Sequence, residues 1–446
     1  MDKITPFLRL SQKVATRTAT VGICGLGYVG LPLAMAVATG GFPVVGFDID
    51  PAKVDAINRR RSYLQTIKSE HIGAFVDAGK LRATTDFAEL AHCDVIIICV
   101  PTPLTRYREP DLSFVSGTAE TIAKHLRHGQ VVILESTTYP GTTREIVKPI
   151  LEADGLRSGV DFFIGYSPER EDPGSRDFAT AAIPKVVSGD GPEATDIVAA
   201  FYSAVVKKVV PVSTMDVAEA TKITENVFRA VNIALVNELK MVYERMGIDV
   251  WEVIEASKTK PFGFMPFYPG PGLGGHCIPI DPFYLTWKSR EHEIPTRFIE
   301  LAGEINIAMP RYVVGKLEEA LGERQSRSLS GSRILVVGLA YKKNVADIRE
   351  SPALKVIDLL EKRGAGVDYH DPFIPVVPEM REHAALHGRK SVALDAATLA
   401  EYDAAIIVTD HDAIDYALLC GQSKLVVDTR NAVARAGIRR ENVVKA

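Results

Sequence analysis

The residues best suited to covalent chemistry lie in one irregular stretch, Phe262 to Asp281. It holds five glycines, four prolines and Cys277 within twenty residues. Glycine lets a backbone approach a ligand closely and proline stiffens a loop, so this stretch could hold the Cys277 sulfur in one place. A cysteine thiolate is a nucleophile, and Asp281 follows it by four residues. The alternative is a buried structural thiol, as most lone cysteines are.

A second candidate site is the glycine motif Gly-Leu-Gly-Tyr-Val-Gly at residues 25–30. A predicted strand precedes it, a predicted helix at Leu31–Thr39 follows it, and the next strand ends at Asp48, eighteen residues beyond the last glycine. This order is typical of dinucleotide binding. The helix N-terminus would take the pyrophosphate and Asp48 the ribose hydroxyls. Because a carboxylate repels a 2′-phosphate, the motif favours NAD over NADP.

Polar loops follow three later apolar patterns at residues 94–100, 130–137 and 161–165. These patterns predict further parallel strands. Open α/β sheets bind ligands at the carboxyl ends of their strands, so the loops are candidate binding segments. Their candidate residues are Thr102, Thr137, Glu169 and Arg170.

Apolar residues three or four apart predict one long helix from Asp216 to Met246. Lys222 and Asn226 are four residues apart in it and therefore share one face. The residues alone also allow a solvated lysine that happens to lie one turn from an asparagine.

A second α/β unit is predicted to begin near Gly331. The strand 332–338 enters a loop as the first one does, but no second or third glycine follows. We therefore expect this unit to bind a different group. The polar stretch 321–329 is the expected linker ahead of it.

The 446 residues are enough for about three domains. We expect an α/β protein with an N-terminal Rossmann NAD domain at residues 1–212 and a helical middle domain at 213–322, which carries the long helix and the Cys277 loop. A C-terminal Rossmann-like domain is expected at 323–446.

The formal net charge of −4 gives no reason to expect binding to nucleic acid or to an acidic membrane surface. The five cysteines lack any Cys-x-x-Cys pair, so we expect neither a disulfide framework nor a metal site. The sequence shows no signal peptide and no membrane-spanning apolar run. These features predict a cytoplasmic protein.

Together these motifs resemble the nucleotide-sugar 6-dehydrogenases, the family that contains UDP-glucose dehydrogenase and its UDP-N-acetylhexosamine relatives. The resemblance runs from about residue 21 to residue 430, and the motifs occur in the family's order. They are Gly-Leu-Gly-Tyr-Val-Gly, Val-Pro-Thr-Pro, Glu-Ser-Thr, Ser-Pro-Glu-Arg, Gly-Gly-His-Cys and Tyr-Lys-Lys…Arg-Glu-Ser-Pro. Lys222 and Asn226 fall on the family's catalytic lysine and asparagine.

The resemblance implies a four-electron oxidation, in which a sugar hydroxymethyl becomes a carboxylate and two NAD are reduced. Cys277 would carry the thiohemiacetal and thioester, and the implied catalytic residues are Cys277, Lys222, Asn226, Asp281, Glu169 and Thr137. Which carboxylate is the main base stays open. Implied NAD contacts are Gly25, Gly27, Tyr28, Val29, Gly30, Asp48, Lys53, Thr102, Thr137 and Arg349.

The implied UDP-sugar contacts are Glu169, Arg170, Lys222, Asn226, Phe267, Tyr268, Gly272, Gly274, Lys342 and Arg430. UDP-glucose members carry Phe-Gly-Gly-Ser-Cys and an upstream lysine, whereas this chain has Leu-Gly-Gly-His-Cys and Tyr268. These differences resemble the N-acetylhexosamine branch, and most of all its UDP-N-acetylglucosamine members. UDP-N-acetylmannosamine and UDP-glucose remain alternative substrates. The apolar face of the long helix implies a homodimer or a higher homo-oligomer.

Two other classes of protein share parts of this pattern. A two-electron hydroxyacid dehydrogenase would share the first domain and the long helix, but it needs neither a nucleophilic cysteine nor a second α/β domain. A non-catalytic nucleotide-sugar binding protein would tolerate the loss of Cys277, Lys222 or Asn226, and all three are present.

Overall fold

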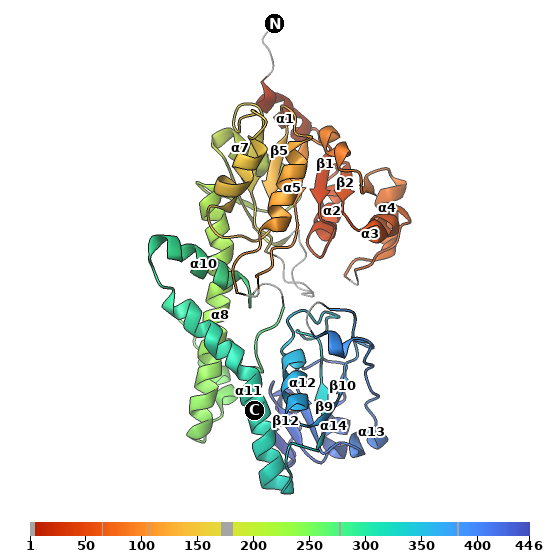
Figure 1. Ribbon diagram of the computed structural model, residues 1–446, viewed down its shortest axis with the longest axis vertical. Coiled ribbons are helices and arrows are strands. Elements are labelled where there is room, and N and C mark those ends of the chain that lie inside the picture. The colour runs from red at the N-terminus through yellow and green to blue at the C-terminus, as the bar shows by residue number, and fades with distance from the viewer. Residues whose placement is uncertain (1–4, 65, 106, 171–181, 276–277, 381–382) are drawn as a thin grey trace. The chain divides into compact units, whose positions relative to one another are not determined.

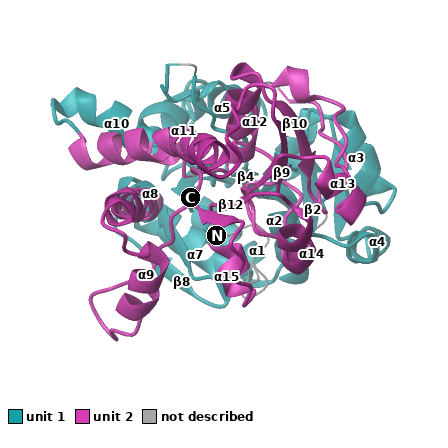
Figure 2. Cartoon of the chain, turned by 90° about the horizontal axis from the view of Figure 1, so that it is seen from below, with its two compact units in different colours: residues 1–225, 283–295 teal, residues 226–282, 296–446 magenta. Residues whose placement is uncertain are grey.

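The computed structural model describes residues 5–64, 66–105, 107–170, 182–275, 278–380 and 383–446. His276 and Cys277 therefore lie outside the described residues. The chain forms two compact units (Figure 2). Unit 1 contains residues 1–225 and 283–295, and unit 2 contains residues 226–282 and 296–446.

Unit 1 is built on an eight-stranded sheet with the order β3-β2-β1-β4-β5-β6-β7-β8 (Figure 1). The strands are β1 (Val21–Cys24), β2 (Val44–Phe47), β3 (Leu81–Thr84), β4 (Val95–Ile98), β5 (Val131–Leu134), β6 (Phe163–Tyr166), β7 (Lys185–Gly189) and β8 (Val209–Pro211). The first six strands are parallel and follow the Rossmann order 3-2-1-4-5-6. The pair β6 and β7 is antiparallel.

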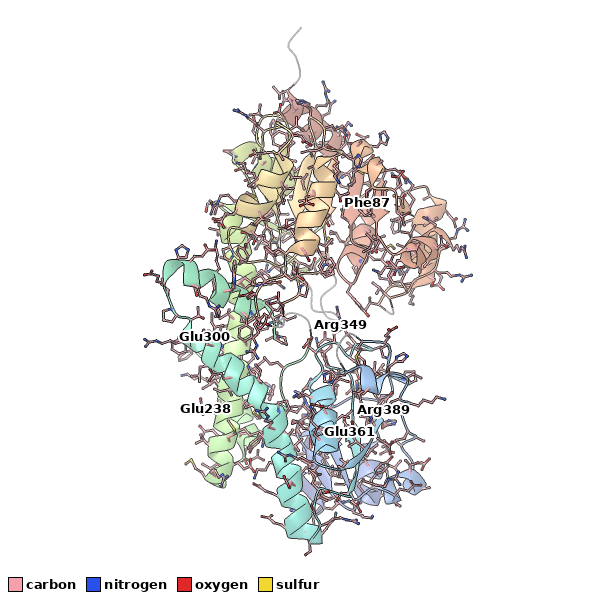
Figure 3. The ribbon with its side chains drawn as sticks, viewed as in Figure 1. Phe87, Glu238, Glu300, Arg349, Glu361 and Arg389 are labelled. Atoms are coloured by element: carbon pink, nitrogen blue, oxygen red, sulfur yellow. The ribbon has the colours of Figure 1, made fainter. Side chains whose placement is uncertain are left out.

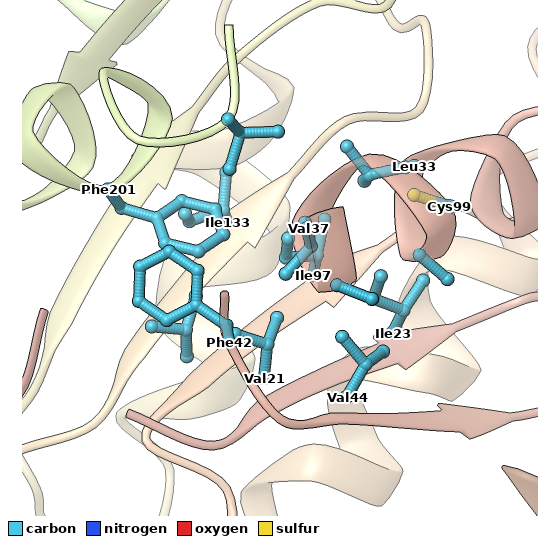
Figure 4. Close-up of a cluster of buried hydrophobic side chains, with 14 of the residues drawn as sticks. Val21, Ile23, Leu33, Val37, Phe42, Val44, Ile97, Cys99, Ile133 and Phe201 are labelled. Carbon is cyan, nitrogen blue, oxygen red and sulfur yellow. The ribbon is translucent and has the colours of Figure 1, made fainter. Parts of the chain in front are cut away.

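Alternating side chains of these strands enter two separate cores. Val21 and Ile23 face the first core with Phe42 and Phe201, whose ring centroids are 5.3 Å apart (Figure 4). Cys24 faces the second core, because neighbouring side chains of a strand point to opposite faces. Both faces of the sheet are thus covered, as expected for continuous apolar strands.

The helices of unit 1 pack on these two faces. They are α1 (Pro6–Ala15), α2 (Gly30–Thr39), α3 (Pro51–Asn58), α4 (Ser69–Asp77), α5 (Ser113–Ala123), α6 (Lys148–Leu151) and α7 (Pro192–Tyr202), with the short helices η1 (Phe87–His92) and η2 (Thr143–Val147). Helices α1, α2 and α7 supply residues to the first core, whereas α5 and α6 supply the second. Unit 1 is therefore a three-layer α/β structure, as predicted.

Unit 2 contains a five-stranded parallel sheet with the order β10-β9-β11-β12-β13. Its strands are β9 (Arg333–Val337), β10 (Gly366–His370), β11 (Ala404–Ile407), β12 (Val426–Asp428) and β13 (Val443–Lys445). This is the flavodoxin-like order 2-1-3-4-5, whose switch point lies between β9 and β11. The prediction of a second Rossmann-like parallel sheet is confirmed.

The helices of unit 2 pack on its sheet, except the first one, which packs on the second half of the long helix. They are α9 (Val250–Lys258), α11 (Arg297–Gln325), α12 (Pro352–Lys362), α13 (Ala396–Ala400), α14 (Tyr416–Gln422), α15 (Ala432–Arg435) and the short helix η5 (Ala384–Leu386). The expected linker at 321–329 is shorter than predicted, because α11 extends to Gln325. Leu321 and Leu329 are both buried in the core of unit 2, and this burial explains the difference.

Two further helices run between the units in sequence. Helix α8 (Met215–Arg245) differs from the predicted long helix by one residue at each end, and α10 (Asp281–Ser289) begins at the predicted catalytic aspartate and leads into η4 (Arg290–His292). No helix in the described ranges is long and apolar enough to cross a membrane.

Glu219 anchors the first part of α8 to unit 1. Its Oε2 accepts a hydrogen bond from the Gly141 backbone N–H at 2.6 Å, and its Oε1 accepts from the Thr143 backbone N–H at 2.9 Å and the Thr143 hydroxyl at 2.6 Å. Burial raises the pKa of Glu219 to about 7, although these three bonds favour the charged form. The contact fixes α8 against the loop that follows β5.

The free energy of unfolding should therefore depend on this carboxyl group. Its pKa rises from 4.5 to about 7 on folding. The folded chain thus holds an extra proton between these values, and its stability falls as the pH rises through them. Glutamine does not titrate, so we expect this fall to be absent in Glu219→Gln. Between about pH 4.5 and pH 7.5, the free energy of unfolding of wild type should drop by up to about 3 kcal/mol relative to that of the variant.

Urea denaturation at several pH values measures this difference. The matched control is Glu238→Gln, which changes an exposed glutamate of the same helix (Figure 3). Its stability curve should run parallel to that of wild type. A parallel curve for Glu219→Gln as well would contradict the assignment.

Candidate active site

The glycine motif after β1 has the shape that a dinucleotide requires. A Cβ atom at Gly30 would lie 1.8 Å from the Gly25 carbonyl oxygen, so only glycine fits there. A Cβ atom at Gly27 would meet no atom of the described residues within 4 Å beyond its chain neighbours, which leaves that backbone open to a ligand. Helix α2 begins at Gly30 without a side-chain cap. The motif therefore fits a pyrophosphate at a helix N-terminus.

Asp48 lies directly after β2 and is 6% exposed. Its Oδ2 accepts hydrogen bonds from the Leu26 backbone N–H at 2.8 Å and from Lys53 Nζ at 3.2 Å, while Oδ1 accepts from the Asp50 backbone N–H at 2.9 Å. The carboxylate is thus fixed beside the glycine motif. Lys53, another predicted cofactor residue, is its ion-pair partner.

The remaining predicted cofactor residues of unit 1 lie in loops near the carboxyl ends of strands. Thr102 follows β4 and is buried, and its carbonyl oxygen accepts a hydrogen bond from the Tyr284 hydroxyl. Thr137 follows β5 and is half-buried. Tyr28 and Val29 lie within the glycine motif, where Tyr28 is 45% exposed. These positions agree with the expected ligand-binding edge of the sheet.

Glu169 and Arg170 follow β6 and have charged partners within unit 1. Glu169 Oε2 lies 3.1 Å from Lys185 Nζ, and its Oε1 accepts from the Arg170 backbone N–H at 2.6 Å. The Arg170 guanidinium donates to both carboxylate oxygens of Glu225 and to the Pro184 carbonyl oxygen. Both side chains are therefore held in place by the protein itself.

Lys222 and Asn226 lie one turn apart on α8, at 5% and 0% exposure. In unit 2, Asn226 Nδ2 donates to Asp281 Oδ2 at 2.5 Å, and Asn226 Oδ1 accepts from Arg229 Nη2 at 2.6 Å. The structure thus brings two predicted catalytic residues, Asn226 and Asp281, into direct contact. An amide NH₂ has two hydrogens, and the bond to Asp281 uses one of them.

The described part of the 262–281 stretch packs on α8 and α9 and on loops and helix ends beside the second sheet. The Phe267 ring lies 5.7 Å from that of Phe228, and Tyr268 stacks on Trp251 at 5.9 Å and donates its hydroxyl to Glu255 at 2.6 Å. These two predicted substrate residues therefore have aromatic partners on α8 and α9.

Arg430 approaches the same stretch from the end of β12. Its Nε donates to the Val408 carbonyl oxygen at 2.9 Å, and a Cβ atom at Gly270 would lie 2.4 Å from its Nη1. The absence of a side chain at Gly270 allows this approach. Burial lowers the pKa of the Arg430 guanidinium, despite the nearby carboxylates of Asp410 and Asp428. An arginine remains charged even so.

Gly272 and Gly274 lie where side chains would collide with unit 2. A Cβ atom at Gly274 would be 2.7 Å from the Tyr341 Cβ, and one at Gly272 would be 3.2 Å from Pro352. Gly275 donates its backbone N–H to the Arg349 carbonyl oxygen at 3.1 Å. The glycines therefore let this stretch lie directly on the loop that carries Lys342.

That loop follows β9 and replaces the phosphate-binding motif of unit 1. The backbone N–H groups of Leu339 and Ala340 donate to Asp371 Oδ2 at 2.6 and 2.9 Å. Buried His411 donates to the same oxygen at 3.0 Å from Nε2 and accepts the Asn344 backbone N–H at Nδ1. Because these donors are used internally, this turn does not offer the amides that a second pyrophosphate would need.

Arg349 lies in the turn just ahead of α12 (Figure 3). Its side chain is 41% exposed and makes a two-pronged contact with Asp347. Lys342 is half-buried in the loop after β9. Both predicted residues thus belong to the same segment of unit 2.

The described cysteines are poor candidates for a nucleophile. Cys24, Cys93, Cys99 and Cys420 are free and buried. Burial raises the pKa of each thiol, to about 12 for Cys93 and about 11 for Cys420. At neutral pH these groups are protonated and unreactive. Cys277 is the fifth cysteine of the sequence.

Three residues that hold predicted site residues or their helix in place were not predicted from the sequence: Glu219, Lys185 and Arg229. Glu219 could have been found, because it lies three residues from Lys222 and seven from Asn226, on the buried face of the helix. A charged residue in such a stripe requires a buried partner. Lys185 is the first residue of an apolar strand, and a lysine there usually indicates only the strand end. Its position therefore does not predict its buried ion pairs. Arg229 likewise has no sequence feature that predicts its contact with Asn226.

Three segments of the chain match one family. Residues 19–230 match the NAD binding domain of the UDP-glucose/GDP-mannose dehydrogenase family, residues 216–308 its central domain, and residues 335–435 its UDP binding domain. UDP-N-acetyl-D-glucosamine 6-dehydrogenase from Pseudomonas aeruginosa is 38% identical over 365 residues, which cover 81% of this chain and 85% of the relative.

Solved structures agree with this assignment. The UDP-D-ManNAc dehydrogenase from Pyrococcus horikoshii has a TM-score of 0.84 at 32% identity and covers 95% of this chain and 97% of its own. The UDP-glucose dehydrogenase from Pyrobaculum islandicum has a TM-score of 0.81 at 30% identity, with coverages of 92% and 94%. The chain therefore belongs to the UDP-glucose/GDP-mannose dehydrogenase family of NAD-dependent nucleotide-sugar oxidoreductases.

Proposed function

We propose that the chain oxidises the C6 hydroxymethyl of UDP-N-acetylglucosamine to a carboxylate, for the synthesis of a surface polysaccharide. Bound NAD would accept the two hydrides that this oxidation releases. The observation that carries the proposal is the buried pair Asn226 and Asp281, joined at 2.5 Å, with Asp281 four residues after Cys277 in the sequence. A two-electron dehydrogenase has no use for a nucleophilic cysteine four residues ahead of such a pair in the sequence.

In the first oxidation the alcohol loses a proton together with a hydride. Lys222, or a water held by the nearby carboxylates, would take that proton as the general base. Lys222 is 5% exposed and Glu219 holds its helix in place one turn earlier. The burial supports a fixed position for the Lys222 amino group.

In the second oxidation the Cys277 thiolate would add to the aldehyde carbon and form a thiohemiacetal. Loss of the second hydride from this adduct gives a thioester, and water then releases the carboxylate and restores the thiol. A thiolate at neutral pH needs nearby positive charge, which Lys222 would supply. The raised pKa values of Cys93 and Cys420 support Cys277 as the nucleophile.

The oxyanion of each tetrahedral adduct would be stabilised by Lys222 and Asn226. Asp281 and Arg229 hold the Asn226 amide at both ends, so its orientation is fixed before substrate arrives. A donor fixed in this way is commonly worth about 3 kcal/mol in the transition state.

Hydrolysis of the thioester would use a water held by Asp281, Thr137 and Glu169. A carboxylate can accept the water proton, while a threonine hydroxyl can orient the water. Asp281 is 2% exposed and bonded to Asn226, a geometry that supports a role in both the adduct and the hydrolysis steps.

The uridine diphosphate would bind to the Cys277 loop and unit 2, with Arg430 and Lys342 near the phosphates and Phe267 and Tyr268 along the nucleotide. Arg430 is half-buried beside Gly270, and a planar guanidinium suits phosphate binding. Arg349 would face the cofactor instead. The match of residues 335–435 to a UDP binding domain supports this assignment.

The N-acetylglucosamine preference is supported by the Leu-Gly-Gly-His-Cys motif and by the Pseudomonas aeruginosa relative. UDP-N-acetylmannosamine is the second candidate, because a relative named UDP-N-acetyl-D-mannosamine dehydrogenase from Pyrococcus horikoshii is 33% identical over 420 residues. The two sugars differ only in the C2 configuration, which few pocket contacts distinguish.

A homodimer formed through α8 completes the proposal. Phe228, Leu235 and Val242 recur every seven residues on α8 and are 46%, 49% and 47% exposed. Such a stripe fits a second copy of the same helix. We place the enzyme in the cytoplasm, where its buried free thiols would stay reduced.

Sedimentation of the full chain tests the dimer. Leu235→Lys places a charge in the middle of the stripe and should shift the protein to the monomer, whereas Glu70→Lys changes an exposed charge on α4, away from the stripe, and gives the control. A wild-type chain that sediments as a monomer would contradict the proposal.

A turnover assay across nucleotide sugars tests the substrate assignment. We expect kcat/KM for UDP-N-acetylglucosamine to exceed that for UDP-N-acetylmannosamine, UDP-glucose and the galacto epimers by about tenfold or more, because a misplaced polar substituent leaves buried groups unpaired. A higher value for either alternative would refute it.

Asn226→Ala should lower kcat about 100-fold while KM changes little, since the amide would act on the adducts rather than on the bound substrate. Asn232→Ala is the matched control. Among the residues that the structure describes, its amide donates only to the Phe228 carbonyl oxygen on the same helix, so this change should leave kcat within about twofold. Equal loss in both variants would argue against an oxyanion role.

A further inference from the structure

A buried ion network connects three strand ends of unit 1. Lys185 Nζ, at the start of β7, lies 3.0 Å from Glu135 Oε2 after β5 and 3.1 Å from Glu169 Oε2 after β6. The side chains of Lys185, Glu135 and Glu169 are 6%, 0% and 14% exposed. A single ammonium group therefore bridges two carboxylates in a dry environment.

Tyr202 of α7 fixes the other side of Glu135. Its hydroxyl donates to Glu135 Oε1, and Lys185 Nζ lies 5.1 Å from the centre of the Tyr202 ring. Burial raises the pKa of Tyr202 well above its usual value, so the hydroxyl remains a donor. Both oxygens of Glu135 thus have a protein partner.

Lys185 stays charged in this setting. Burial alone would lower its pKa, but the charges of Glu135 and Glu169 outweigh that effect and raise the pKa above its usual range. A buried charge persists only when it is paired in this way, and removal of one partner is costly.

Two further titratable groups lie beside the network. Cys99 at the end of β4 is buried and protonated, because burial raises its pKa well above the usual value. Arg170 beside Glu169 forms an ion pair with Glu225 at 2.5 Å. Lys185 contacts the Glu169 carboxylate directly within unit 1.

We propose that Lys185 is a positioning residue that holds the Glu169 carboxylate ionised and in one orientation for the hydrolysis step, and that Glu135 and Tyr202 hold Lys185 in place. This inference rests on the proposed function, because it assigns a purpose to Glu169 there. Because Lys185 bridges two carboxylates, the proposal makes a distinctive prediction. Glu135 and Lys185 must affect Glu169 in opposite directions.

The pH dependence of kcat distinguishes this role from a structural one. Removal of the Lys185 charge favours protonated Glu169 and should move the acid limb of kcat to higher pH by about one unit in Lys185→Met. Removal of the Glu135 charge favours ionised Glu169 and should move the limb to lower pH in Glu135→Gln. A purely structural role would lower stability without moving the limb in two opposite directions.

The experiment measures kcat from about pH 5.5 to 9.5 with saturating UDP-N-acetylglucosamine and NAD. Circular dichroism and thermal unfolding check that each variant is folded. Where Lys185→Met does not fold, Lys185→Met combined with Glu135→Gln keeps the buried charges balanced and is compared with Glu135→Gln. Its limb must lie at higher pH. Where only Glu135→Gln folds, its shift to lower pH decides the question.

Glu169→Gln separates the two proposals. If this variant loses the acid limb and much of kcat, Glu169 takes part in the reaction and the other variants test Lys185. In that case, the positioning role would be overturned if the acid limb of kcat in every folded variant lay within about 0.3 pH unit of the wild-type limb. If Glu169→Gln keeps wild-type kcat at every pH, the role of Glu169 in the proposed function is wrong, and the purpose of Lys185 fails with it.

Discussion

The buried hydrogen bond between Asn226 and Asp281 is the contact on which the proposed chemistry depends. Neither group can be buried without a partner, because an unpaired amide or carboxylate in the interior costs several kcal/mol. Their pairing at 2.5 Å ties α8 to the start of α10 within unit 2. This contact fixes an amide donor and a carboxylate four residues beyond Cys277. A reactive sulfur near this pair would face an amide and a carboxylate whose orientations are fixed.

The rest of the fold follows from parallel strands whose carboxyl ends carry the polar loops. In unit 1 these ends hold the glycine motif, Asp48 and Glu169, and in unit 2 they hold Lys342 and Arg430. The two sheets also use an acid after their second strand in similar ways. Asp48 accepts the Leu26 amide, while Asp371 accepts the equivalent Leu339 amide and further donors. Because Asp371 also takes the Ala340 amide, the turn after β9 uses a second backbone N–H that a pyrophosphate would otherwise need.

Local patterns in the sequence predicted the local structure well. Apolar runs predicted β1, β4 and β5, and three- and four-residue spacing predicted α8 to within one residue. Contacts between distant segments were not predictable, because no local pattern encodes them. Glu219 meets Thr143 across 76 residues, and Lys185 meets Glu135 across 50. The predicted linker at 321–329 begins too early. Leu321 continues the buried face of α11, but the polar residues that follow it do not indicate this burial.

The central claim is that a sulfur atom retains the sugar aldehyde so that a second oxidation follows the first. The most direct test is the number of NADH formed per UDP-sugar consumed, in wild type and in Cys277→Ser, with the sugar product identified by mass spectrometry. The account predicts two NADH and a carboxylate product for wild type, and loss of carboxylate formation with retained UDP-sugar binding for the variant. One NADH per sugar in wild type, or undiminished carboxylate formation by Cys277→Ser, would contradict it.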